Sequence, residues 1–413
     1  MSPLQKLRTL SNFKMADNFN VNIVQIGNNL LSISDMTGMK KIDQDTLTTI
    51  GNYNYTDDIS KEKIAMITCA HPTKLPFDKY VYNYVVNMVP QNMTHMYNTQ
   101  FFRIDSTKEP LSREIVYEEY SSSPPPYMHQ FANTENYLIL FEYPLWWHEL
   151  QIPLGVKVLP HMEWNPALSK NGTKVKVIDK RTWTLVKTYY TDPFFAYHHV
   201  NAWEDGWGGE LVVDIMTVPC ETPTGTLING KKPLASCLHM NAFNMDTLKT
   251  AGWDIPRGSL RRFHVPTTGD KDISFEDLNH YGMDLYAIHP ALKGKQHRYV
   301  WSMGNHGDAS HEGVWWNSIL RIDLKTNKTL EWYKEDHYPS EVSFIPRPGA
   351  WKEDDGVLIS TVLGAPLGKS YLLVLDATTL EEIATADAPE FLPFPSHGHS
   401  CAPVKGQNLC FWG

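Results

Sequence analysis

Short apolar segments that alternate with polar residues, each closed by an aspartate and a turn rich in Thr or Ser, recur along the chain. Two clear copies are "VKVIDKRTWTLVK" around Asp179 and "LLVLDATTLEEIA" around Asp376. Alternation with a period of two predicts β-strands, and Asp and Thr side chains supply the local hydrogen bonds of tight turns. We therefore expect a β-hairpin at each copy, and the copies lie at Asp43, Asp105, Asp179, Asp323 and Asp376.

The repeat predicts an all-β fold assembled from similar units. Long stretches of helical periodicity are scarce, and Gly and Pro are frequent. Hairpin-bearing units at this spacing favour a β-propeller with elaborated blades over the alternative, a two-domain array of β-sandwiches. The long interval between Asp179 and Asp323 leaves room for a further copy that the motif does not reveal.

Composition fits a globular chain with an ample core. Of the 413 residues, 42% are hydrophobic and 12% are aromatic, so we expect order throughout and one domain spanning residues 1–413. The formal net charge of -9 offers no basic surface field for nucleic acid. The five cysteines form no C-x-x-C pair, and we interpret them as reduced thiols, which predicts a cytoplasmic location.

The N-terminal segment carries the one signal for a membrane. No apolar run is long enough to span a bilayer, and a signal peptide's apolar core is missing. In "MSPLQKLRTLSNFKM" apolar side chains recur every third residue, with basic residues between them. This pattern fits a short interfacial helix, so residues 1–19 are a candidate membrane-docking segment for peripheral contact. The alternative is a helix packed against the body of the protein.

Four histidines follow four of the repeat aspartates at a similar distance. In a propeller the innermost strand of each blade lines the central channel, so side chains at the same phase converge on one axis. One such His is usually a core residue with satisfied hydrogen bonds, whereas four in phase favour a metal site. Four neutral imidazoles without a carboxylate ligand suit Fe(II), Zn(II) or Cu. The four positions are His71, His129, His198 or its neighbour His199, and His397.

The adjacent pair in "FFAYHHVNAWEDG" poses a choice. Neighbouring side chains of a strand point to opposite faces, so only one of His198 and His199 can face the channel. The spacing alone does not choose between them.

Five segments, from about residue 20 to the end, resemble the carotenoid cleavage oxygenase family. The resemblance implies Fe(2+) as the metal, held by His71, His129, His198 and His397; it selects His198 because the first His of that pair is the family's constant position. The five segments are "CAHPTKLP", "YMHQFANTENYLILFEYPL", "FFAYHHVNAWEDG", "HYPSEVSFIPRPGAWKEDDGVLIS" and "LPFPSHGHSCAPV".

The resemblance also implies a seven-bladed β-propeller with loops capping one face. Acids that bond the ligand histidines would be Asp35, Glu276 and Glu341, with Asp35 standing where Glu is usual; such acids fix the imidazole tautomer. Ser34 and Tyr197, which precede Asp35 and His198, are candidates near the metal. Relatives begin earlier than this chain, in which 34 residues precede Asp35. We therefore expect a propeller incomplete at its N-terminal side and leave organelle targeting open.

The implied activity is cleavage of a conjugated C=C bond of a carotenoid or apocarotenoid by O2, giving two carbonyl products. Two alternatives remain open. One is a retinoid-type isomerohydrolase on the same fold, and the other is a catalytically inactive propeller that binds a pigment or a protein partner.

Overall fold

The computed structural model describes most of the chain as β-strands. The described residues are 19–59, 64–89, 96–123, 125–147, 162–164, 170–206, 209–219, 258–279, 283–307, 316–392, 397–398, 400–404 and 407–411. Two short 3-10 helices, η4 (Pro290–Leu292) and η5 (Ala365–Leu367), are the helical elements of this part of the chain.

Six antiparallel sheets of four or five strands form the blades. Blade 1 contains β1 (Asn22–Ile26), β2 (Asn29–Ile33), β3 (Met39–Ile42) and β4 (Thr49–Asn52). Blade 2 contains β5 (Ile64–Thr68), β6 (Tyr80–Met88), β7 (Tyr97–Asp105) and β8 (Arg113–Ser121). Blade 3 contains β9 (Ala132–Asn133), β10 (Tyr137–Glu142), β13 (Thr173–Asp179) and β14 (Thr184–Thr191).

Blades 4 and 6 each have an inner strand in two pieces. Blade 4 contains β15 (Phe194–Phe195), β16 (His199–Asp205), β17 (Glu210–Pro219), β18 (Ser259–Pro266) and β19 (Ser274–Asn279). Blade 5 contains β20 (Asp284–Ala287), β21 (Tyr299–Gly304), β22 (Ser318–Asp323) and β23 (Lys328–Tyr333). Blade 6 contains β24 (His337–Pro339), β25 (Ser343–Pro346), β26 (Gly356–Gly364), β27 (Lys369–Asp376) and β28 (Glu382–Asp387).

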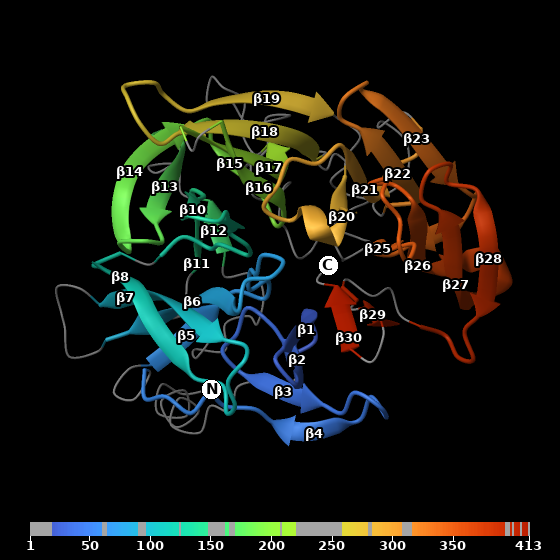
Figure 1. The fold of residues 1–413 in the computed structure, drawn as a ribbon, viewed down its shortest axis with the longest axis horizontal. Coiled ribbons are helices and arrows are strands. Elements are labelled where there is room, and N and C mark those ends of the chain that lie inside the picture. Colours follow the sequence, from blue (N-terminus) through green and yellow to red (C-terminus); the bar gives the residue numbers. More distant parts are fainter. Residues whose placement is uncertain are drawn as a thin grey trace, which may run out of the picture.

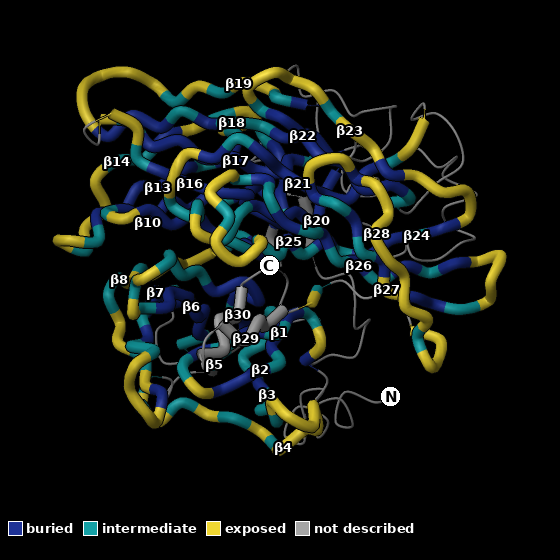
Figure 2. The backbone as a smooth tube through the Cα atoms, turned by 45° about the vertical axis from the view of Figure 1, so that its right-hand side comes forward, coloured by how far each residue is buried: buried dark blue, intermediate teal, exposed yellow. Residues whose placement is uncertain are grey.

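The blades surround a common axis, with the first strand of each at the axis and the last at the rim (Figure 1). Exposure increases at the rim: the middle strands β21 and β22 of blade 5 are buried at every residue, whereas the rim strand β28 of blade 6 is exposed at every residue (Figure 2). The all-β propeller predicted from the repeat is confirmed.

The predicted number of blades is wrong for the described residues, which form six blades rather than seven. The remaining strands are two hairpins, β11 (Leu145–Trp147) with β12 (Met162–Trp164), and β29 (Ser400–Val404) with β30 (Gln407–Phe411). The second hairpin lies between blade 6 and blade 1 (Figure 1). In the part of the chain that the structure describes, two strands do not make a seventh blade, because neither has the second sheet neighbour that a middle strand needs.

The hairpins predicted from the Asp motif are confirmed, and each is the outermost hairpin of its blade. Asp376, for example, ends β27, and its Oδ1 accepts hydrogen bonds from the amides of Thr378 at 2.8 Å and Thr379 at 3.0 Å. The further copy expected between Asp179 and Asp323 corresponds to the turn between β18 and β19 in blade 4. That turn uses Gly269 at a φ of 73° in place of the Asp motif, which explains why the motif did not reveal it.

Aromatic contacts join neighbouring blades. Trp301 of blade 5 stacks on Phe344 of blade 6, with ring centroids 4.4 Å apart and an interplanar angle of 8°. Its indole N–H donates to the carbonyl oxygen of Ala377 at 2.9 Å. Phe141 of blade 3 similarly contacts Phe263 of blade 4, with centroids 5.2 Å apart. Such rings bury large apolar surfaces between the sheets and fix the order of the blades around the axis.

Several expectations concern residues that the structure does not describe. Residues 1–18, which carry the whole apolar N-terminal stripe, are among them. The segments 148–161, 220–257 and 308–315 also lie outside the described residues, so the loops expected to cap one face stay a prediction. Within the described residues, no helix has the length and hydropathy of a membrane span.

We predict that Trp301→Ala lowers the free energy of unfolding by about 3–5 kcal/mol, because it leaves a cavity between two blades and removes a buried hydrogen bond. Urea denaturation followed by far-UV circular dichroism measures the change. Trp351→Ala is the matched control, since Trp351 is 86% exposed and its loss is expected to cost less than about 0.5 kcal/mol. Equal effects of the two substitutions would contradict the packing described above.

Candidate metal centre

The four predicted histidines lie beside the innermost strands, at points where the backbone leaves the sheet. His71 follows β5, and His129 precedes β9. His198 lies in the interruption between β15 and β16, which both pair with β17. His397 precedes β29. A residue released from the strand ladder is not bound to the alternation of the pleat, so its side chain can turn towards the axis.

The structure brings these four side chains together. The ring centroid of His71 lies 4.6 Å from that of His129, 4.8 Å from that of His198 and 4.5 Å from that of His397. One nitrogen from each ring belongs to a set whose members all lie within 4.8 Å of one another. Imidazole nitrogens bind zinc at about 2.0–2.1 Å, which places opposite ligands roughly 4 Å apart. A small inward movement of the rings would therefore enclose one metal ion.

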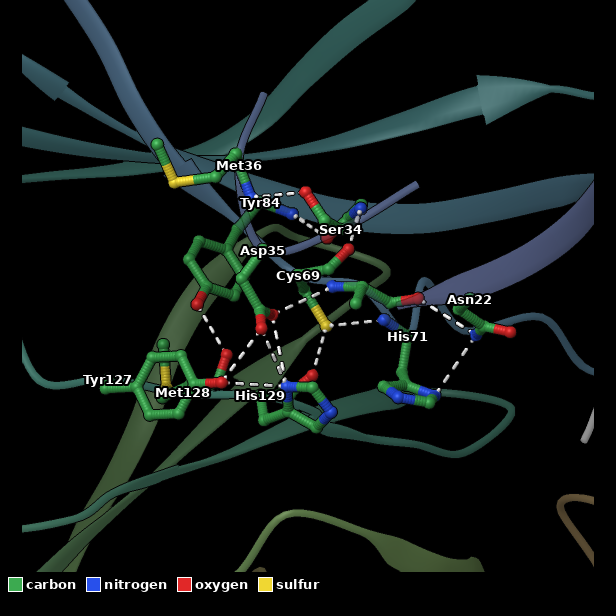
Figure 3. A network of polar contacts seen from close by, with 12 residues as sticks. Asn22, Ser34, Asp35, Met36, Cys69, His71, Tyr84, Tyr127, Met128 and His129 are labelled. Atoms are coloured by element: carbon green, nitrogen blue, oxygen red, sulfur yellow. Dashed lines mark hydrogen bonds and ion pairs between the residues drawn. The ribbon is translucent and has the colours of Figure 1, made fainter. Parts of the chain in front are cut away.

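Asp35 and Tyr127 hold the His129 ring (Figure 3). The Asp35 carboxylate lies 3.0 Å and 3.1 Å from His129 Nδ1 through its two oxygens. The Tyr127 hydroxyl donates to Asp35 Oδ2 at 2.9 Å and lies 2.9 Å from the same Nδ1. Asp35 follows β2 of blade 1 and also accepts a hydrogen bond from the Ala70 amide at 3.2 Å. The short Asp side chain thus reaches the imidazole directly.

Two further carboxylates bond the next two rings. Asp284 Oδ1 lies 2.7 Å from His198 Nδ1, and Glu341 Oε1 lies 2.9 Å from His397 Nδ1. Glu341 occupies the gap between β24 and β25, the second interrupted inner strand, and its other oxygen accepts from the Gly398 amide at 2.8 Å. A carboxylate on Nδ1 selects the Nδ1–H tautomer, which leaves the lone pair of Nε2 available to a metal.

His71 has an amide as its neighbour instead of a carboxylate. Asn22 Nδ2 lies 3.3 Å from His71 Nδ1 and donates to the Ala70 carbonyl oxygen at 3.0 Å (Figure 3). The Nε2 atoms of His71 and His198 are buried and have no hydrogen-bond partner among the described residues. Buried polar nitrogens left without a partner are costly, and a shared metal ion would satisfy them. The donor set therefore fits a divalent transition metal.

Burial and crowding set the charge state of the rings. Burial, followed by the neighbouring histidines, holds the pKa of His71 well below its usual value. Burial also lowers the pKa of His198, although Asp284 opposes it. For His397 burial is the largest influence and favours the neutral ring, but Glu341, together with Asp284 and Asp35, outweighs burial and raises the pKa. His71 and His198 are therefore neutral at pH 7, the form that binds metal.

The pairing predicted for Glu276 is wrong. Glu276 lies on β19, the rim strand of blade 4, where its Oε1 is 3.8 Å from His264 Nε2. Asp284, eight positions later on the inner strand β20, contacts His198 instead. A sequence signal existed: Asp284 opens the apolar run "DLYAI", whereas Glu276 lies in the polar alternation "SFEDLN" of an exposed strand.

Ser34 and Tyr197 differ in their relation to the histidines. The buried Ser34 hydroxyl accepts a hydrogen bond from the Met36 amide at 3.1 Å, so it shapes the bend that presents Asp35 (Figure 3). The Tyr197 ring packs against the centre, with its centroid 5.3 Å from that of His129 and 4.7 Å from that of Phe195. Of these two residues, Tyr197 packs directly against a candidate ligand, whereas Ser34 acts on the backbone beside Asp35.

His199 is directed to a different environment from His198. Its Nε2 lies 2.8 Å from the hydroxyl of the buried Tyr143, and its ring packs on Phe141 with centroids 5.4 Å apart. Burial lowers its pKa to about 3. It is not a member of the set of four converging nitrogens.

Comparison with known proteins finds similarity to one family model and to proteins named as carotenoid cleavage dioxygenases. The family model described as "Retinal pigment epithelial membrane protein" matches residues 1–399. "Carotenoid cleavage dioxygenase 8, chloroplastic" of Arabidopsis thaliana is 28% identical over 407 residues, which cover 95% of this chain and 66% of that protein. Human "Beta,beta-carotene 15,15'-dioxygenase" is 27% identical over 430 residues, covering 92% and 72%. The chain thus spans about two thirds of the length of the plant relative.

Solved structures show the same fold. Cobalt-substituted Synechocystis ACO superposes with a TM-score of 0.72 at 20% identity, covering 95% of this chain and 76% of that one. An ACO/RPE65 chimera superposes with a TM-score of 0.70, also at 20% identity and the same coverage.

We predict that His198→Ala removes stoichiometric metal from the purified protein, whereas His199→Ala retains it, because only the first ring belongs to the converging set. Inductively coupled plasma mass spectrometry gives the metal content, and circular dichroism checks that both variants fold. The reverse result would show that the wrong neighbour was assigned to the centre.

A second prediction tests whether Asp284 or Glu276 supports metal binding. Asp284→Asn weakens metal binding by about 10- to 100-fold, the usual effect of losing a carboxylate that orients a ligand His. Glu276→Gln is the matched control and leaves the affinity unchanged. Competition with a chelator of known affinity measures both constants, and a larger loss in Glu276→Gln would contradict the arrangement.

Proposed function

This chain belongs to the retinal pigment epithelial membrane protein family, with carotenoid cleavage dioxygenases among its relatives, and we propose that it is an Fe(II)-dependent oxygenase that cleaves a carotenoid or apocarotenoid. The observation that carries the proposal is the convergence of four histidine nitrogens within 4.8 Å, with carboxylates at three of the rings. Four imidazole nitrogens without a carboxylate ligand suit Fe(II) among other divalent transition metals. Closed structural zinc sites instead prefer thiolates or mixed Cys and His ligands.

The proposed reaction adds O2 across one conjugated C=C bond, breaks that bond and gives each of the two carbonyl products one oxygen atom. Ferrous iron, when bound, supplies the activation of O2. His71, His129, His198 and His397 would hold the ion. The surrounding carboxylates keep three of the rings in the tautomer that offers Nε2. No side chain needs to move a proton in this scheme, so the protein contributes orientation and exclusion of water.

An aromatic wall beside His129 supports an apolar substrate. The Tyr197 ring contacts both His129 and Phe195, and the Phe195 ring stacks on Tyr127 with centroids 6.1 Å apart and an interplanar angle of 15°. A polyene offers no polar group at the bond that reacts, so flat aromatic surfaces and shape must position it. We therefore propose Tyr197 as a residue that contacts substrate.

The names of the relatives favour cleavage over the alternatives. Both sequence relatives described above are named as dioxygenases, which favours oxygenation over retinoid isomerohydrolysis. Stoichiometric iron in the purified protein would separate an enzyme from an inactive propeller.

Carotenoids partition into membranes, so peripheral membrane contact through residues 1–19 is also part of the proposal. Sedimentation with liposomes, with and without these residues, tests it. Imaging of the protein in cells tests whether it lies in the cytoplasm, as we propose, or in an organelle.

We predict that the iron-loaded protein, incubated with β-carotene or an apocarotenal under 18O2, yields aldehydes that each carry one labelled oxygen atom. Immediate reduction to alcohols prevents exchange with water before mass spectrometry. His198→Ala, expected to lack iron, is the negative control. Release of an isomerised retinoid alcohol from an ester, without O2 uptake, would support the isomerohydrolase instead. Unchanged polyene beside a metal-free protein would support the inactive propeller.

A further inference from the structure

A cavity lies between blade 1 and blade 2, within the hydrophobic core that the two sheets share. Its volume is about 230 Å3. Its walls include residues of β1, β2 and β3 from blade 1 and of β5, β6 and β7 from blade 2. Most of the lining is apolar, and Val24, Ile33, Ala65, Val85 and Phe102 all belong to or pack against one core cluster. Protein cores leave few voids larger than a water molecule, so a space of this size calls for an explanation.

Short side chains on the inner strands leave this space open. Where blade 5 meets blade 6, the stacked rings of Trp301 and Phe344 fill the interface, with centroids 4.4 Å apart. Where blade 1 meets blade 2, the innermost strands β1 and β5 contribute Val24 and Ala65 to the wall instead. The cavity is therefore a consequence of the residues chosen at this one interface.

The polar residues of the wall are bonded to other protein groups. Thr68 Oγ1 donates to a carbonyl oxygen of β6 at 2.6 Å, and Asn83 Nδ2 donates to the Cys69 carbonyl oxygen at 3.0 Å. Arg113 Nη2 donates to Asp57 Oδ1 at 2.7 Å. Among the described residues, none of the buried side-chain nitrogens and oxygens that lack a hydrogen-bond partner belongs to this lining. A buried water needs two to four polar partners, so the cavity suits an apolar guest better than water.

The cavity extends from the surface towards the metal centre. Asn54, an exposed residue between the half-buried Tyr53 and Tyr55, is part of the wall on the outer side. A small molecule can therefore reach the cavity from solvent at the segment that follows β4.

Cys69 lines the cavity on the side of the candidate ligands (Figure 3). Its thiol is fully buried, donates to the His129 carbonyl oxygen at 2.7 Å and accepts from the His71 amide at 3.2 Å. Ser34, which precedes Asp35, lines the cavity as well. The inner side of the cavity is thus formed by residues that contact or adjoin the histidines of the centre.

We propose that the cavity between blades 1 and 2 binds dioxygen and supplies it to the metal centre. O2 is small, uncharged and apolar, so it gains by leaving water for such a space. An apolar cavity of about 150 Å3 stays dry and binds benzene or xenon, and this cavity is larger. Pockets for drug-sized ligands begin at roughly 300 Å3, so an intact carotenoid does not fit. The supply role rests on the proposed oxygenase function, whereas the binding of a gas does not.

Xenon is the probe, because it is apolar and its anomalous scattering locates it in crystals pressurised with the gas. We expect an anomalous peak between Val24 and Ala65 in the metal-loaded protein. Ala65→Phe places a ring in the cavity and is expected to lower the xenon occupancy about tenfold or more. Ala386→Phe, the same change on the exposed rim strand β28, is the matched control and leaves the peak unchanged.

The dependence of the rate on O2 gives the second readout. With an oxygen electrode, Ala65→Phe is expected to raise the KM for O2 about threefold or more while kcat stays within about twofold, because the substitution narrows the path of O2 but leaves the centre intact. Metal content, measured in parallel, checks that the centre is unchanged.

Wild-type crystals without xenon in the cavity, or equal peaks in the wild type and Ala65→Phe, would overturn the gas site. Xenon in the cavity together with an unchanged KM for O2 in Ala65→Phe would overturn the supply role. If Ala65→Phe fails to fold, Val24→Phe on the facing wall decides by the same two measurements. Xenon bound in a protein that consumes no O2 would support the gas site and contradict the oxygenase proposal, so the two failures are distinguishable.

Discussion

Four imidazole rings gathered at the axis of the propeller are the constraint on which the rest of this structure depends. The rings of three histidines lie 4.5 to 4.8 Å from that of His71. Packing so many polar nitrogens inside a protein is costly unless each finds a partner. Carboxylates lie beside Nδ1 of three of the rings, and an amide lies beside Nδ1 of His71. One nitrogen of each ring belongs to the set whose members lie within 4.8 Å of one another.

The carboxylates that hold the rings also hold the blades. Asp35 follows a strand of blade 1 and contacts His129, which leads into blade 3. Asp284 of blade 5 contacts His198 in blade 4. Each of these hydrogen bonds crosses from one sheet to another, so the geometry of the centre and the arrangement of the blades depend on each other. Precise ligand placement is thus a consequence of how the propeller closes around its axis.

The centre has two chemically different surroundings. Aromatic rings, among them Phe195 and Tyr197, pack beside His129. A polar pocket containing Lys293 adjoins His71. The side of the centre at His129 is therefore apolar, whereas the side at His71 is polar.

The sequence by itself determined the unit of the fold and the candidate donors of the centre, except for the choice between His198 and His199, which the spacing left open. Aspartate-terminated strands mark hairpins because their turns are local, and the four histidines stand out because they share a phase with those turns. Tertiary structure alone decided which carboxylate meets His198, since Glu276 and Asp284 are close in sequence but lie on the rim and inner strands of different blades. It also decided the number of blades, because sheet closure depends on contacts between residues far apart in the chain.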